Sequence, residues 1–461
     1  MRHRPPRGVR MRRAANRAEP GEEEVLELTL GEPAHGGACV AREESGRVVF
    51  VRHGLPGERV RARVTSTRNT LAWAEVAEVL DPSPDRVPSV WPEAGPGGVG
   101  GGELAHVRPS AQRRWKETVL RGQLRRVGGE ALLDAVTALG GVRVDPTPGD
   151  GDEADPLLGR RTRIELVVTP DGRAGMHRYR TREVVGVEEM PLAVPAIQEL
   201  GLFGSDSPWG GVWRAGDRVR AVAPNGGKAV LVAPSGAWAL REGRPTRVED
   251  EPLTWTVRRP GGAPDAQETF SVRARGFWQS HVRGAETLAE AVMRASQVAE
   301  GDRVMELYSG AGLFTRFLAQ AAGPAGRVAS LEGDEGAVAD ATANLEGWPQ
   351  AETFVGTVDA AGVLELAGEL GAGGASEGRG SEAAADVVVL DPPRAGAGRE
   401  VCRALCSLGA PRVVLVSCDP AAGARDLRAL VEGGYALESF EAWDLFPHTH
   451  HVEFVAGLTR G

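Results

Sequence analysis

A single thiol near the end of the chain is placed where it could react. Cys418 follows an apolar run and directly precedes Asp419-Pro420, in the stretch RVVLVSCDPAAGARDL. The apolar run predicts a buried strand, and Asp419 and Pro420 are typical of the first residues of a helix. A thiol beside a helix N-terminus has a lowered pKa, whereas the neighbouring carboxylate opposes that effect. Cys418 is therefore either a nucleophile or a small buried residue that ends a strand.

Several polar side chains lie downstream, in PHTHHVEF. The stretch could be interpreted as a set of metal ligands: His448, His450, His451 and Glu453. Glu453, however, begins the apolar run VEFVAGL and is better explained as part of a strand. The three histidines then have no compatible fourth ligand, so we expect no metal here. Cys402 and Cys406 lie four residues apart on one predicted helical face, and we expect both in the core.

The turn in RVMELYSGAGLF could approach a cofactor closely. Gly310 and Gly312 permit this at the carboxyl edge of a predicted strand, where open α/β sheets bind ligands. The third glycine of the dinucleotide fingerprint is missing, because Thr315 stands there. The next predicted strand ends at Glu332, which could accept hydrogen bonds from a ribose diol. This combination fits either a dinucleotide or S-adenosylmethionine.

Asp391 favours S-adenosylmethionine over a dinucleotide. It ends the apolar run VVVL and is followed by two prolines and Arg394. Asp-Pro-Pro at this point is frequent in methyltransferases that act on base nitrogens or RNA bases, and it is uncommon in dehydrogenases. A residue that only caps a turn is the other interpretation of Asp391.

A multidomain chain must position these residues. After Phe270, strand-like and helical runs alternate, which is typical of a Rossmann-like, doubly wound α/β domain, expected at residues 266–461. Upstream, short β-rich runs separated by turns predict a five-stranded TRAM- or OB-like barrel at residues 21–82. A central β-rich α+β domain is expected at residues 83–265. A densely basic arm, residues 1–20, precedes them.

One basic amphipathic helix is expected within the central domain, at residues 108–127. Trp115 lies on its apolar side, and cationic side chains crowd the rest of its surface: Arg113, Arg114, Lys116, Arg121, Arg125 and Arg126. Such a face could bind phosphates or could simply be solvated. A hairpin that turns at Pro170-Asp171-Gly172 carries further arginines at residues 178–182.

Composition limits the possible classes of protein. The 461 residues carry a net charge of −9 and four cysteines, with no Cys-x-x-Cys pair. Any contact with nucleic acid must therefore be a local basic patch, and neither a disulfide framework nor a zinc module is indicated. No apolar run is long enough to cross a membrane. We expect a cytoplasmic monomer.

Six motifs follow one another in a specific order: FWQSH, ELYSGAGLF, LEGDEGAV, DPPRAG, VSCDPAAGARDL and DLFPHTHHVEFV. They resemble those of the bacterial uridine-C5 RNA methyltransferases, which make 5-methyluridine in tRNA and rRNA. The resemblance covers most of the chain, because that family also carries an N-terminal TRAM barrel and a central β-rich domain. The last two motifs are specific, whereas the Gly-x-Gly turn occurs in many families.

The resemblance implies a role for each matching residue. Cys418 matches the nucleophile, and Glu453 matches the base. The residues that match S-adenosylmethionine contacts are Gln279, Tyr308, Glu332 and Asp391, with Asp359 as the adenine-side acid and the turn glycines Gly310 and Gly312 beside them. Leu313 stands where members often have an asparagine, which removes one polar contact with the cofactor. The histidines before Glu453 would shape the uracil pocket or bind backbone phosphate.

The implied reaction needs one thiol and one carboxylate. C5 of uracil is a poor nucleophile, but addition of a thiolate to C6 gives C5 carbanion character, so that C5 can attack the methyl group of a sulfonium. The C5 proton must then pass to a positioned base before the thiolate is eliminated. The target base must also leave its stack.

One feature of the resembled family is missing. Many members hold a four-cysteine iron–sulfur cluster, and the matching positions here carry Trp91, Val99, Gly102 and Met190. None of these can supply a thiolate, and no nearby cysteine substitutes, so we predict no iron–sulfur cluster. The segment must then fold by packing alone, with Trp91 and Val99 filling the volume.

These observations predict an S-adenosylmethionine-dependent RNA uridine-C5 methyltransferase, with rRNA slightly favoured over tRNA because of the TRAM-like barrel. A second interpretation is methylation of an amino group, where Asp391-Pro392-Pro393 would hold the target nitrogen and Cys418 would be idle. A third is an RNA-binding protein without activity on a methyltransferase scaffold. The presence of both Cys418 and Glu453 argues against the third.

Overall fold

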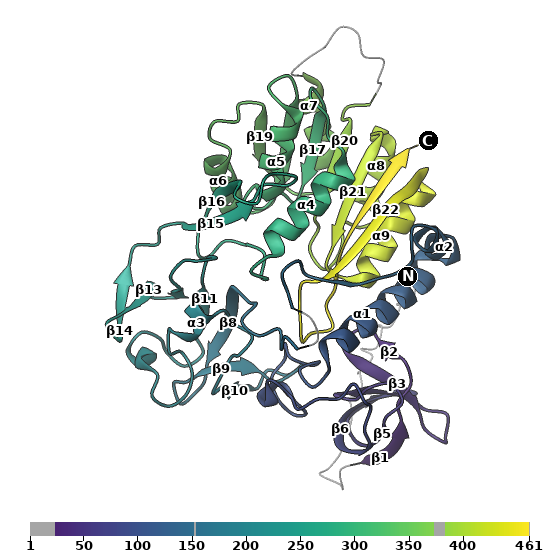
Figure 1. Ribbon diagram of the computed structural model, residues 1–461, viewed down its shortest axis with the longest axis vertical. Helices are drawn as coiled ribbons and strands as arrows, with labels where there is room; N and C mark the ends of the chain where they lie inside the picture. Colours follow the sequence, from purple (N-terminus) through teal and green to yellow (C-terminus); the bar gives the residue numbers. More distant parts are fainter. Residues whose placement is uncertain (1–23, 152–153, 373–382, 461) are drawn as a thin grey trace, which may run out of the picture.

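The computed structural model describes residues 24–151, 154–372 and 383–460. Figure 1 shows a small β-rich part at one end, a second β-rich part beside it, and a large α/β part at the other end. The C-terminal strands and the loop that precedes the last strand run from the α/β part down to the place where all three meet. The predicted basic arm, residues 1–20, lies outside the described residues.

The N-terminal part is one curled sheet. Its strands are β1 (Val25–Thr29), β2 (Pro33–Ala34), β3 (Ala38–Arg42), β4 (Val48–Arg52), β5 (Arg59–Arg68) and β6 (Leu71–Asp81), in the order β1-β5-β6-β4-β3-β2. Alternation explains the curl: Val60 and Ala62 of β5 are buried, whereas Arg59 and Arg61 are exposed. The sheet has six strands where five were expected, because the two-residue strand β2 carries no periodicity that a sequence could reveal.

The central part is an antiparallel sheet with a tryptophan-rich core. Its strands are β8 (Arg163–Val168), β9 (Ala174–His177), β10 (Val184–Gly186), β11 (Arg218–Val222), β12 (Val230–Ala233), β13 (Gly236–Arg241) and β14 (Arg244–Val248), in the order β10-β9-β8-β11-β12-β13-β14. Short helices η1 (Pro92–Ala94), α3 (Pro195–Gln198) and η3 (Pro208–Gly211) cover it. The predicted hairpin is present, because β8 and β9 pair around the turn at residues 170–172.

The C-terminal part is an eight-stranded sheet in the order β19-β18-β17-β20-β21-β23-β22-β7. Its strands are β7 (Asp145–Pro146), β17 (Arg303–Leu307), β18 (Arg327–Glu332), β19 (Ala351–Val355), β20 (Val387–Leu390), β21 (Arg412–Ser417), β22 (Tyr435–Asp444) and β23 (Glu453–Arg460). Strands β17 to β21 are parallel, and β23 pairs antiparallel with β21. This is the predicted doubly wound arrangement.

Helices cover both faces of this sheet, and a separate hydrophobic cluster lies between the sheet and the helices on each face. They are α4 (Gly284–Ser296), α5 (Leu313–Ala322), α6 (Glu335–Asn344), α7 (Ala360–Ala372), α8 (Arg399–Leu408) and α9 (Pro420–Glu432). Among the helices that the structure describes, none is both long and apolar enough to cross a membrane.

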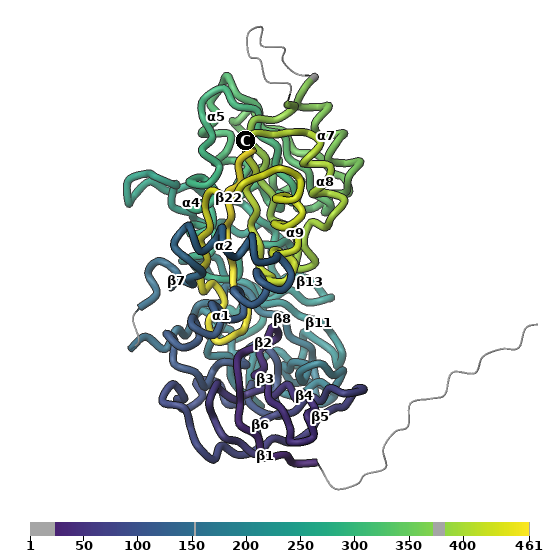
Figure 2. Tube along the Cα trace, turned by 90° about the vertical axis from the view of Figure 1, so that its right-hand side faces the viewer, coloured from purple at the N-terminus to yellow at the C-terminus, as the bar shows by residue number. Residues whose placement is uncertain are grey.

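Two segments from upstream in the chain also pack on the α/β part. Helix α1 (Pro109–Gln123), the π-helical turn η2 (Leu124–Gly128) and α2 (Glu130–Ala138) lie against α9, as Figure 2 also shows. The hairpin of β15 (Leu253–Arg258) and β16 (Gln267–Val272) packs against α4 and α6. This hairpin spans the expected domain boundary between residues 265 and 266, so the chain passes into the α/β part gradually.

Candidate active site

The parallel strands bring the predicted cofactor residues to one edge. Leu307 at the end of β17 pairs with Leu390 at the end of β20, so Tyr308 and Asp391 follow the ends of neighbouring strands. Strand β18 lies on the other side of β17 and ends at Glu332. Ligands of open α/β sheets bind at this carboxyl edge.

The antiparallel pair brings the predicted catalytic residues to the same edge. Ser417 at the end of β21 pairs with Phe454 near the start of β23. The next position on each strand is therefore Cys418 and Glu453. Because β20 pairs in parallel with β21, Asp391 lies beside them. The fold thus unites a thiol and two carboxyls that are far apart in the sequence.

Asp419 forms the helix N-cap that the sequence predicted. Its Oδ1 accepts hydrogen bonds from Ala421 N at 3.0 Å and from Ala422 N at 2.9 Å, and Pro420 is the first residue of α9. These bonds satisfy amide groups that a helix start otherwise leaves without partners. They also fix the direction in which the chain leaves Cys418.

The pKa of the half-buried Cys418 thiol is raised to about 12. Burial is the largest cause, the carboxyls of Glu453, Asp391 and Asp419 add to it, and the Arg394 guanidinium opposes it. The sequence left open whether the helix terminus or the acidic neighbours would dominate. The acidic neighbours and burial do, so the thiol holds its proton at neutral pH.

Glu453 and Asp391 form a pair of carboxyls of raised pKa. Glu453 is only 3% exposed, and burial is the main reason why its pKa lies well above the ordinary value. Burial also raises the pKa of Asp391, and the negative charge of Asp391 raises that of Glu453 further. Arg394 opposes the shift at Glu453. A buried carboxyl of raised pKa is suited to accept a proton near neutral pH.

A small cavity of about 40 Å³ lies at the same edge. Its lining residues are Phe277, Trp278, Gln279, Tyr308, Ser309, Gly310, Ala311, Leu313, Phe314 and Asp391. Four predicted cofactor residues therefore meet here: Gln279, Tyr308, Gly310 and Asp391. Leu313 lines the cavity as well, and it contributes a hydrocarbon surface where an asparagine would contribute an amide.

The turn that borders the cavity has an unusual backbone. Gly310 and Gly312 have φ angles of 55° and 82°, and Tyr308 has a φ of 63°. Glycine adopts such angles freely, whereas a tyrosine is strained there. Glu332 holds the turn, because its Oε2 accepts a hydrogen bond from Gly310 N at 3.0 Å. An ordered turn of this kind is prepared to meet a ligand with its backbone.

Two of the predicted cofactor residues lie farther along the edge. Glu332 is partly exposed, and its Oε1 also accepts a hydrogen bond from Asp334 N at 2.9 Å. Asp359 is exposed, and its Oδ1 accepts bonds from Ala361 N and Gly362 N at the start of α7. Neither side chain lines the cavity itself. Both follow the ends of successive strands, where a ligand longer than the cavity would extend.

Sequence reasoning missed Glu306. This residue of β17 is buried, and its pKa is raised to about 8, first by burial and then by the charges of Asp391 and Glu332. Among the described residues, Glu306 Oε2 and the buried Ser309 Oγ have no hydrogen-bond partner. An acid within the apolar run RVMEL was the signal that could have revealed it. Of these groups, Ser309 and Asp391 line the cavity, so a hydroxyl without a partner and a carboxyl are available there to a ligand with polar or cationic groups.

The loop before β23 is anchored by α1. His448 N donates to Gln112 Oε1 at 2.7 Å, and the His448 ring lies 3.1 Å from Gln112 Nε2. Lys116 is fully buried and forms an ion pair with Asp444. The prediction that Lys116 belongs to a phosphate-facing surface is therefore wrong, because the side chain turns inward to hold this loop.

The other two histidines of the loop face the barrel and the catalytic edge. His450 pairs with the buried Glu103, and its ring lies 4.2 Å from that of His451. Within the part of the chain that the structure describes, no group of His, Cys, Asp or Glu side chains could hold a metal ion.

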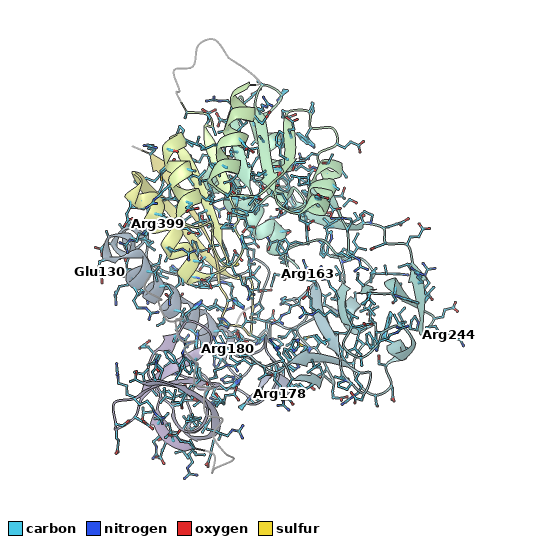
Figure 3. The ribbon with its side chains drawn as sticks, turned by 180° about the vertical axis from the view of Figure 1, so that it is seen from behind. Glu130, Arg163, Arg178, Arg180, Arg244 and Arg399 are labelled. Carbon is cyan, nitrogen blue, oxygen red and sulfur yellow. The ribbon has the colours of Figure 1, made fainter. Side chains whose placement is uncertain are left out.

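A larger cavity of about 310 Å³ opens between the central sheet and this loop. Its lining residues are Gly101, Arg160, Arg161, Arg163, Ile164, Glu165, Met176, Met190, Ser280, His281, Arg394, Leu445, Phe446, Pro447, Thr449 and His451. Four arginines thus surround a space that adjoins the catalytic edge through Arg394. Figure 3 shows Arg163 near the centre of the molecule, where the parts meet.

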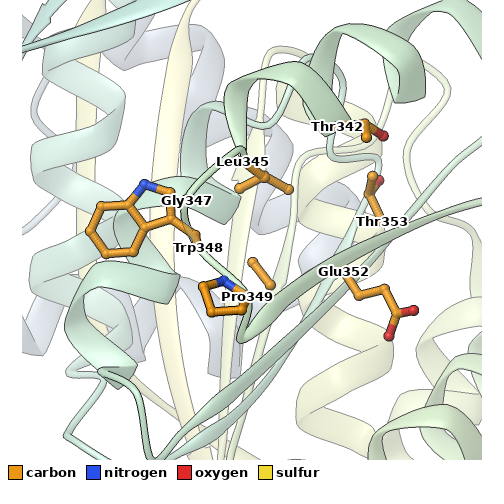
Figure 4. A pocket seen from close by; sticks show the side chains of 8 residues that line it. Thr342, Leu345, Gly347, Trp348, Pro349, Glu352 and Thr353 are labelled. Atoms are coloured by element: carbon orange, nitrogen blue, oxygen red, sulfur yellow. The ribbon is translucent and has the colours of Figure 1, made fainter.

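A hollow of about 390 Å³ lies at the opposite end of the sheet, beside β19 (Figure 4). Its lining residues are Thr342, Leu345, Gly347, Trp348, Pro349, Ala351, Glu352 and Thr353. These described residues include none of those predicted for catalysis or cofactor binding. The hollow is therefore separate from the candidate site.

Comparison with known proteins agrees with this geometry. The TRAM domain model matches residues 22–77, and the tRNA (Uracil-5-)-methyltransferase model matches residues 377–460, which include the thiol and the buried glutamate. A Streptomyces avermitilis protein named as an RNA methyltransferase is 40% identical over 458 residues, which cover 94% of this chain and 98% of the relative. This chain belongs to the uracil-C5 RNA methyltransferase family.

Two further similarities extend over most of the chain. The 23S rRNA (uracil(1939)-C(5))-methyltransferase RlmD of Acinetobacter baumannii is 28% identical, over 90% of this chain and 89% of the relative. The solved tRNA (uracil-54, C5)-methyltransferase of Pyrococcus abyssi, in complex with S-adenosyl-L-homocysteine, superimposes with a TM-score of 0.62 at 21% identity. It covers 94% of this chain and 99% of that structure. The methyltransferase therefore has the predicted multidomain fold, and its cofactor is S-adenosylmethionine.

The positions that match a family iron–sulfur cluster do not fit one here. Trp91, Val99 and Met190 are buried in one hydrophobic cluster, and Trp91 Nε1 donates to the carbonyl of Glu189 at 3.1 Å. A Cβ added at Gly102 would lie only 2.6 Å from Trp91 Cε3. The indole thus fills the space beside Gly102, and these side chains contain no thiolate. The absence of a cluster stays a prediction.

Proposed function

We propose that the methyltransferase acts on C5 of a uridine in rRNA through a covalent adduct between Cys418 and C6 of the base. The observation that supports this most is the meeting of Cys418, Glu453 and Asp391 beside a cavity with four predicted cofactor residues. S-Adenosylmethionine supplies the electrophilic methyl group when it is bound.

The residues of the chain divide the remaining work. Cys418 Sγ forms a bond to C6, and the electron pair of the C5–C6 double bond moves toward C5, which then takes the methyl group. Glu453 accepts the C5 proton, the double bond forms again, and the bond between C6 and Cys418 breaks. Because the pKa values of both Cys418 and Glu453 are raised, each must lose its proton before its step. Arg394 is the cationic side chain that favours this loss at both groups.

Asp391 and Gln279 are proposed to hold the cofactor in the smaller cavity, with Tyr308 and the turn glycines against it. Glu332 and Asp359 are proposed to bind its ribose and adenine beyond the cavity, because both lie at successive strand ends. In the present arrangement Glu332 also binds Gly310 N, so it would orient the turn and the ligand together.

The RNA is proposed to enter through the arginine-lined cavity. Four arginines and three aromatic or histidine side chains border a space of about 310 Å³, which is large enough for a nucleobase, and Arg394 belongs both to this space and to the catalytic edge. We favour rRNA over tRNA because of the TRAM domain and the similarity to a relative named as an rRNA methyltransferase. The proposal also places the enzyme in the cytoplasm. One chain carries the whole site, so we propose a monomer, and light scattering after gel filtration would check this oligomeric state.

The decisive experiment uses RNA that contains 5-fluorouridine. Fluorine at C5 cannot leave as a proton does, so the reaction should stop at an adduct in which Cys418 is bonded to C6. We expect a complex of protein and RNA that survives denaturing electrophoresis and requires S-adenosylmethionine. Cys418→Ala should abolish it, whereas Cys406→Ala, which removes a half-buried thiol on α8, should not. An active enzyme that gives no adduct would contradict the proposal.

A second measurement separates methylation of C5 from methylation of an amino group. RNA labelled with tritium at C5 of uridine should release tritium as methyl groups are transferred. Under the alternative, Cys418→Ala would keep most of the activity and no tritium would be released. Mass-spectrometric mapping of 5-methyluridine in rRNA and tRNA, from cells with and without the gene, identifies the substrate.

A further inference from the structure

The turn between β2 and β3 of the barrel reaches the catalytic edge. His35 lies in this turn, and its Nε2 is 3.3 Å from Asp419 Oδ2. The His35 ring also meets the ring of His450 edge-on, with centroids 6.2 Å apart. Asp419 directly follows Cys418 in the chain. A residue of the barrel therefore contacts the neighbour of the nucleophile, consistent with the place of β2 in Figure 1, next to α1 and below α9.

The turn is seated closely against the rest of the molecule. Gly36 and Gly37 have φ angles of 96° and 81°, which a side chain would disfavour. A Cβ added at Gly37 would lie 3.1 Å from Glu103 Cγ and 3.3 Å from His450 Nδ1. From the other side, Tyr179 Oη donates to the carbonyl of Gly36 at 3.4 Å. The position of His35 is thus fixed by contacts on both sides of the turn.

The two carboxylate oxygens of Asp419 have different partners. Oδ1 caps α9 through its two backbone hydrogen bonds, and Oδ2 meets His35. Burial alone would raise the pKa of Asp419, but the hydrogen bond with His35 and the helix amides hold it at about 2, so the side chain is charged. This charge is one of those that stabilise the protonated form of Cys418. The other charged groups around the thiol are Glu453, Asp391 and Arg394.

We propose that His35 is a positioning residue of the methyl transfer, which orients Asp419 at the start of α9 and offsets its charge beside Cys418. This inference rests on the proposed function, since it concerns the same nucleophile. The barrel then contributes directly to the reactivity of the site, in addition to any contact with RNA. His450 is the other ring that faces His35, and it is already paired with Glu103.

The test measures the reactivity of Cys418 without RNA or cofactor. Iodoacetamide alkylates the thiolate, so its rate at neutral pH reports the thiolate fraction, and mass spectrometry of peptides distinguishes Cys418 from the other three cysteines. His35→Ala should slow alkylation about threefold, because half a pKa unit corresponds to about this factor. Asp419→Asn keeps the capping oxygen but removes the charge, so it should accelerate alkylation by a similar factor. The two substitutions therefore move the rate in opposite directions.

The double variant provides the sharpest comparison. If His35 acts through the charge of Asp419, His35→Ala should have no further effect on alkylation in the Asp419→Asn background. His35→Gln retains a donor and should recover part of the rate. His177→Ala, which removes an exposed histidine on β9, is the matched control and should change nothing. Equal alkylation rates in wild type and His35→Ala, with equal thermal stability, would overturn the inference.

Steady-state kinetics distinguish this role from simple RNA binding. We expect His35→Ala to lower kcat about threefold and to leave KM for RNA unchanged, because the residue acts on the nucleophile. A rise in KM with unchanged kcat and unchanged alkylation would instead assign His35 to RNA contact and overturn the proposal. Altered alkylation in a protein that makes no 5-methyluridine would contradict the proposed function but not the coupling between His35 and Cys418.

Discussion

At the scale of single residues, the site holds groups that disfavour one another's charge. Burial raises the pKa values of Cys418, Asp391 and Glu453, neighbouring carboxyls add to the shifts at Cys418 and Glu453, and Arg394 opposes the shifts at these two groups. Without ligands the Cys418 thiol keeps its proton at neutral pH, so it is protected from chance reactions such as oxidation, which needs a thiolate. A bound cation at the cofactor cavity would favour the charged forms, which links reactivity to cofactor binding.

The first prediction concerns the pH dependence of the methyl transfer. Cys418 must be a thiolate and Glu453 a carboxylate, and the folded protein raises both pKa values. The fraction of each group in its charged, active form grows as the pH rises toward its raised pKa, so the single-turnover rate should rise with pH from about 6 to about 9. Quenched-flow measurements with saturating RNA and cofactor would check this. A rate that falls over this range would contradict the assigned roles.

A second prediction separates the base from the nucleophile. Glu453→Gln keeps the size of the side chain but cannot accept the C5 proton. The methylated base should then stay bonded to Cys418, so that ordinary RNA with S-adenosylmethionine accumulates a complex stable to denaturing electrophoresis, while turnover falls at least about a hundredfold. Glu438→Gln, which alters an exposed carboxyl on β22 that pairs with Arg412, is the control and should turn over normally. Normal turnover by Glu453→Gln would assign the base elsewhere.

Recognisable motifs led to the predicted site residues. Cys418 and Glu453 were chosen because their flanks are distinctive, and the strand register places the two side by side, whereas their catalytic roles stay predictions. Glu306 was missed, since a single acid in an apolar strand resembles an ordinary variation. The direction of the pKa shift at Cys418 could not be predicted either, because its causes lie on separate strands that meet only in the fold.

At the scale of elements, α1 supports the catalytic loop. Its apolar side packs into the cores, as its period predicted, but it also sends Gln112 and Lys116 to the loop before β23. Lys116 Nζ donates to the carbonyl of Phe446 at 2.9 Å in addition to its ion pair with Asp444. Helical periodicity identifies a face but not its partner, so the sequence placed Lys116 among the solvent-exposed cations.

The third prediction tests this anchor. Lys116→Met removes the cation but leaves the Asp444 carboxylate buried, so we expect a loss of about 3–5 kcal/mol in the free energy of unfolding. Urea denaturation followed by circular dichroism would measure it. The double variant with Asp444→Leu removes the uncompensated charge and should recover much of the stability. Arg125→Met, at an exposed cation that pairs with Glu130, is the control and should cost less than about 1 kcal/mol.

The fourth prediction concerns the segment that matches a cluster site in relatives. Because Trp91 fills the space beside Gly102, the purified protein should contain no iron and show no absorbance near 400 nm, even when purified without oxygen. Gly102→Cys should destabilise the protein by about 1–3 kcal/mol, since its Cβ would collide with the indole and with Ala94. An iron-containing sample would contradict this. Gly122→Cys, where no atom lies within 4 Å of an added Cβ, is the steric control.

At the scale of the whole molecule, this acidic chain places a local group of arginines where its parts meet. The net charge is −9, yet Arg160, Arg161, Arg163 and Arg394 surround one cavity. Figure 3 places Arg178 and Arg180 between the barrel and the central sheet, and Arg244 at the far outer edge. Sequence patterns indicated three parts and their order, because strand and helix periods differ. They could not indicate that the barrel turn, α1 and the last loop converge, since these contacts join segments hundreds of residues apart.

The fifth prediction follows from this distribution of charge. Arg180 is exposed, and it reaches the barrel turn, because a Cβ added at Gly36 would lie 3.8 Å from Arg180 Nη2. A strand of RNA that approaches Cys418 past His35 would therefore meet Arg180. If Arg180 binds one phosphate, Arg180→Ala should weaken RNA binding and reduce the slope of log K against log salt concentration by about 0.7. Arg244→Ala removes an equal charge far from the site and should leave the slope unchanged. Fluorescence anisotropy titrations of both variants between about 50 and about 200 mM salt would separate the effect of a local contact from the effect of net charge. Equal loss of slope in the two variants would mean that RNA responds to the total charge of the molecule, and the arginines at the junction would then have no special role in guiding it.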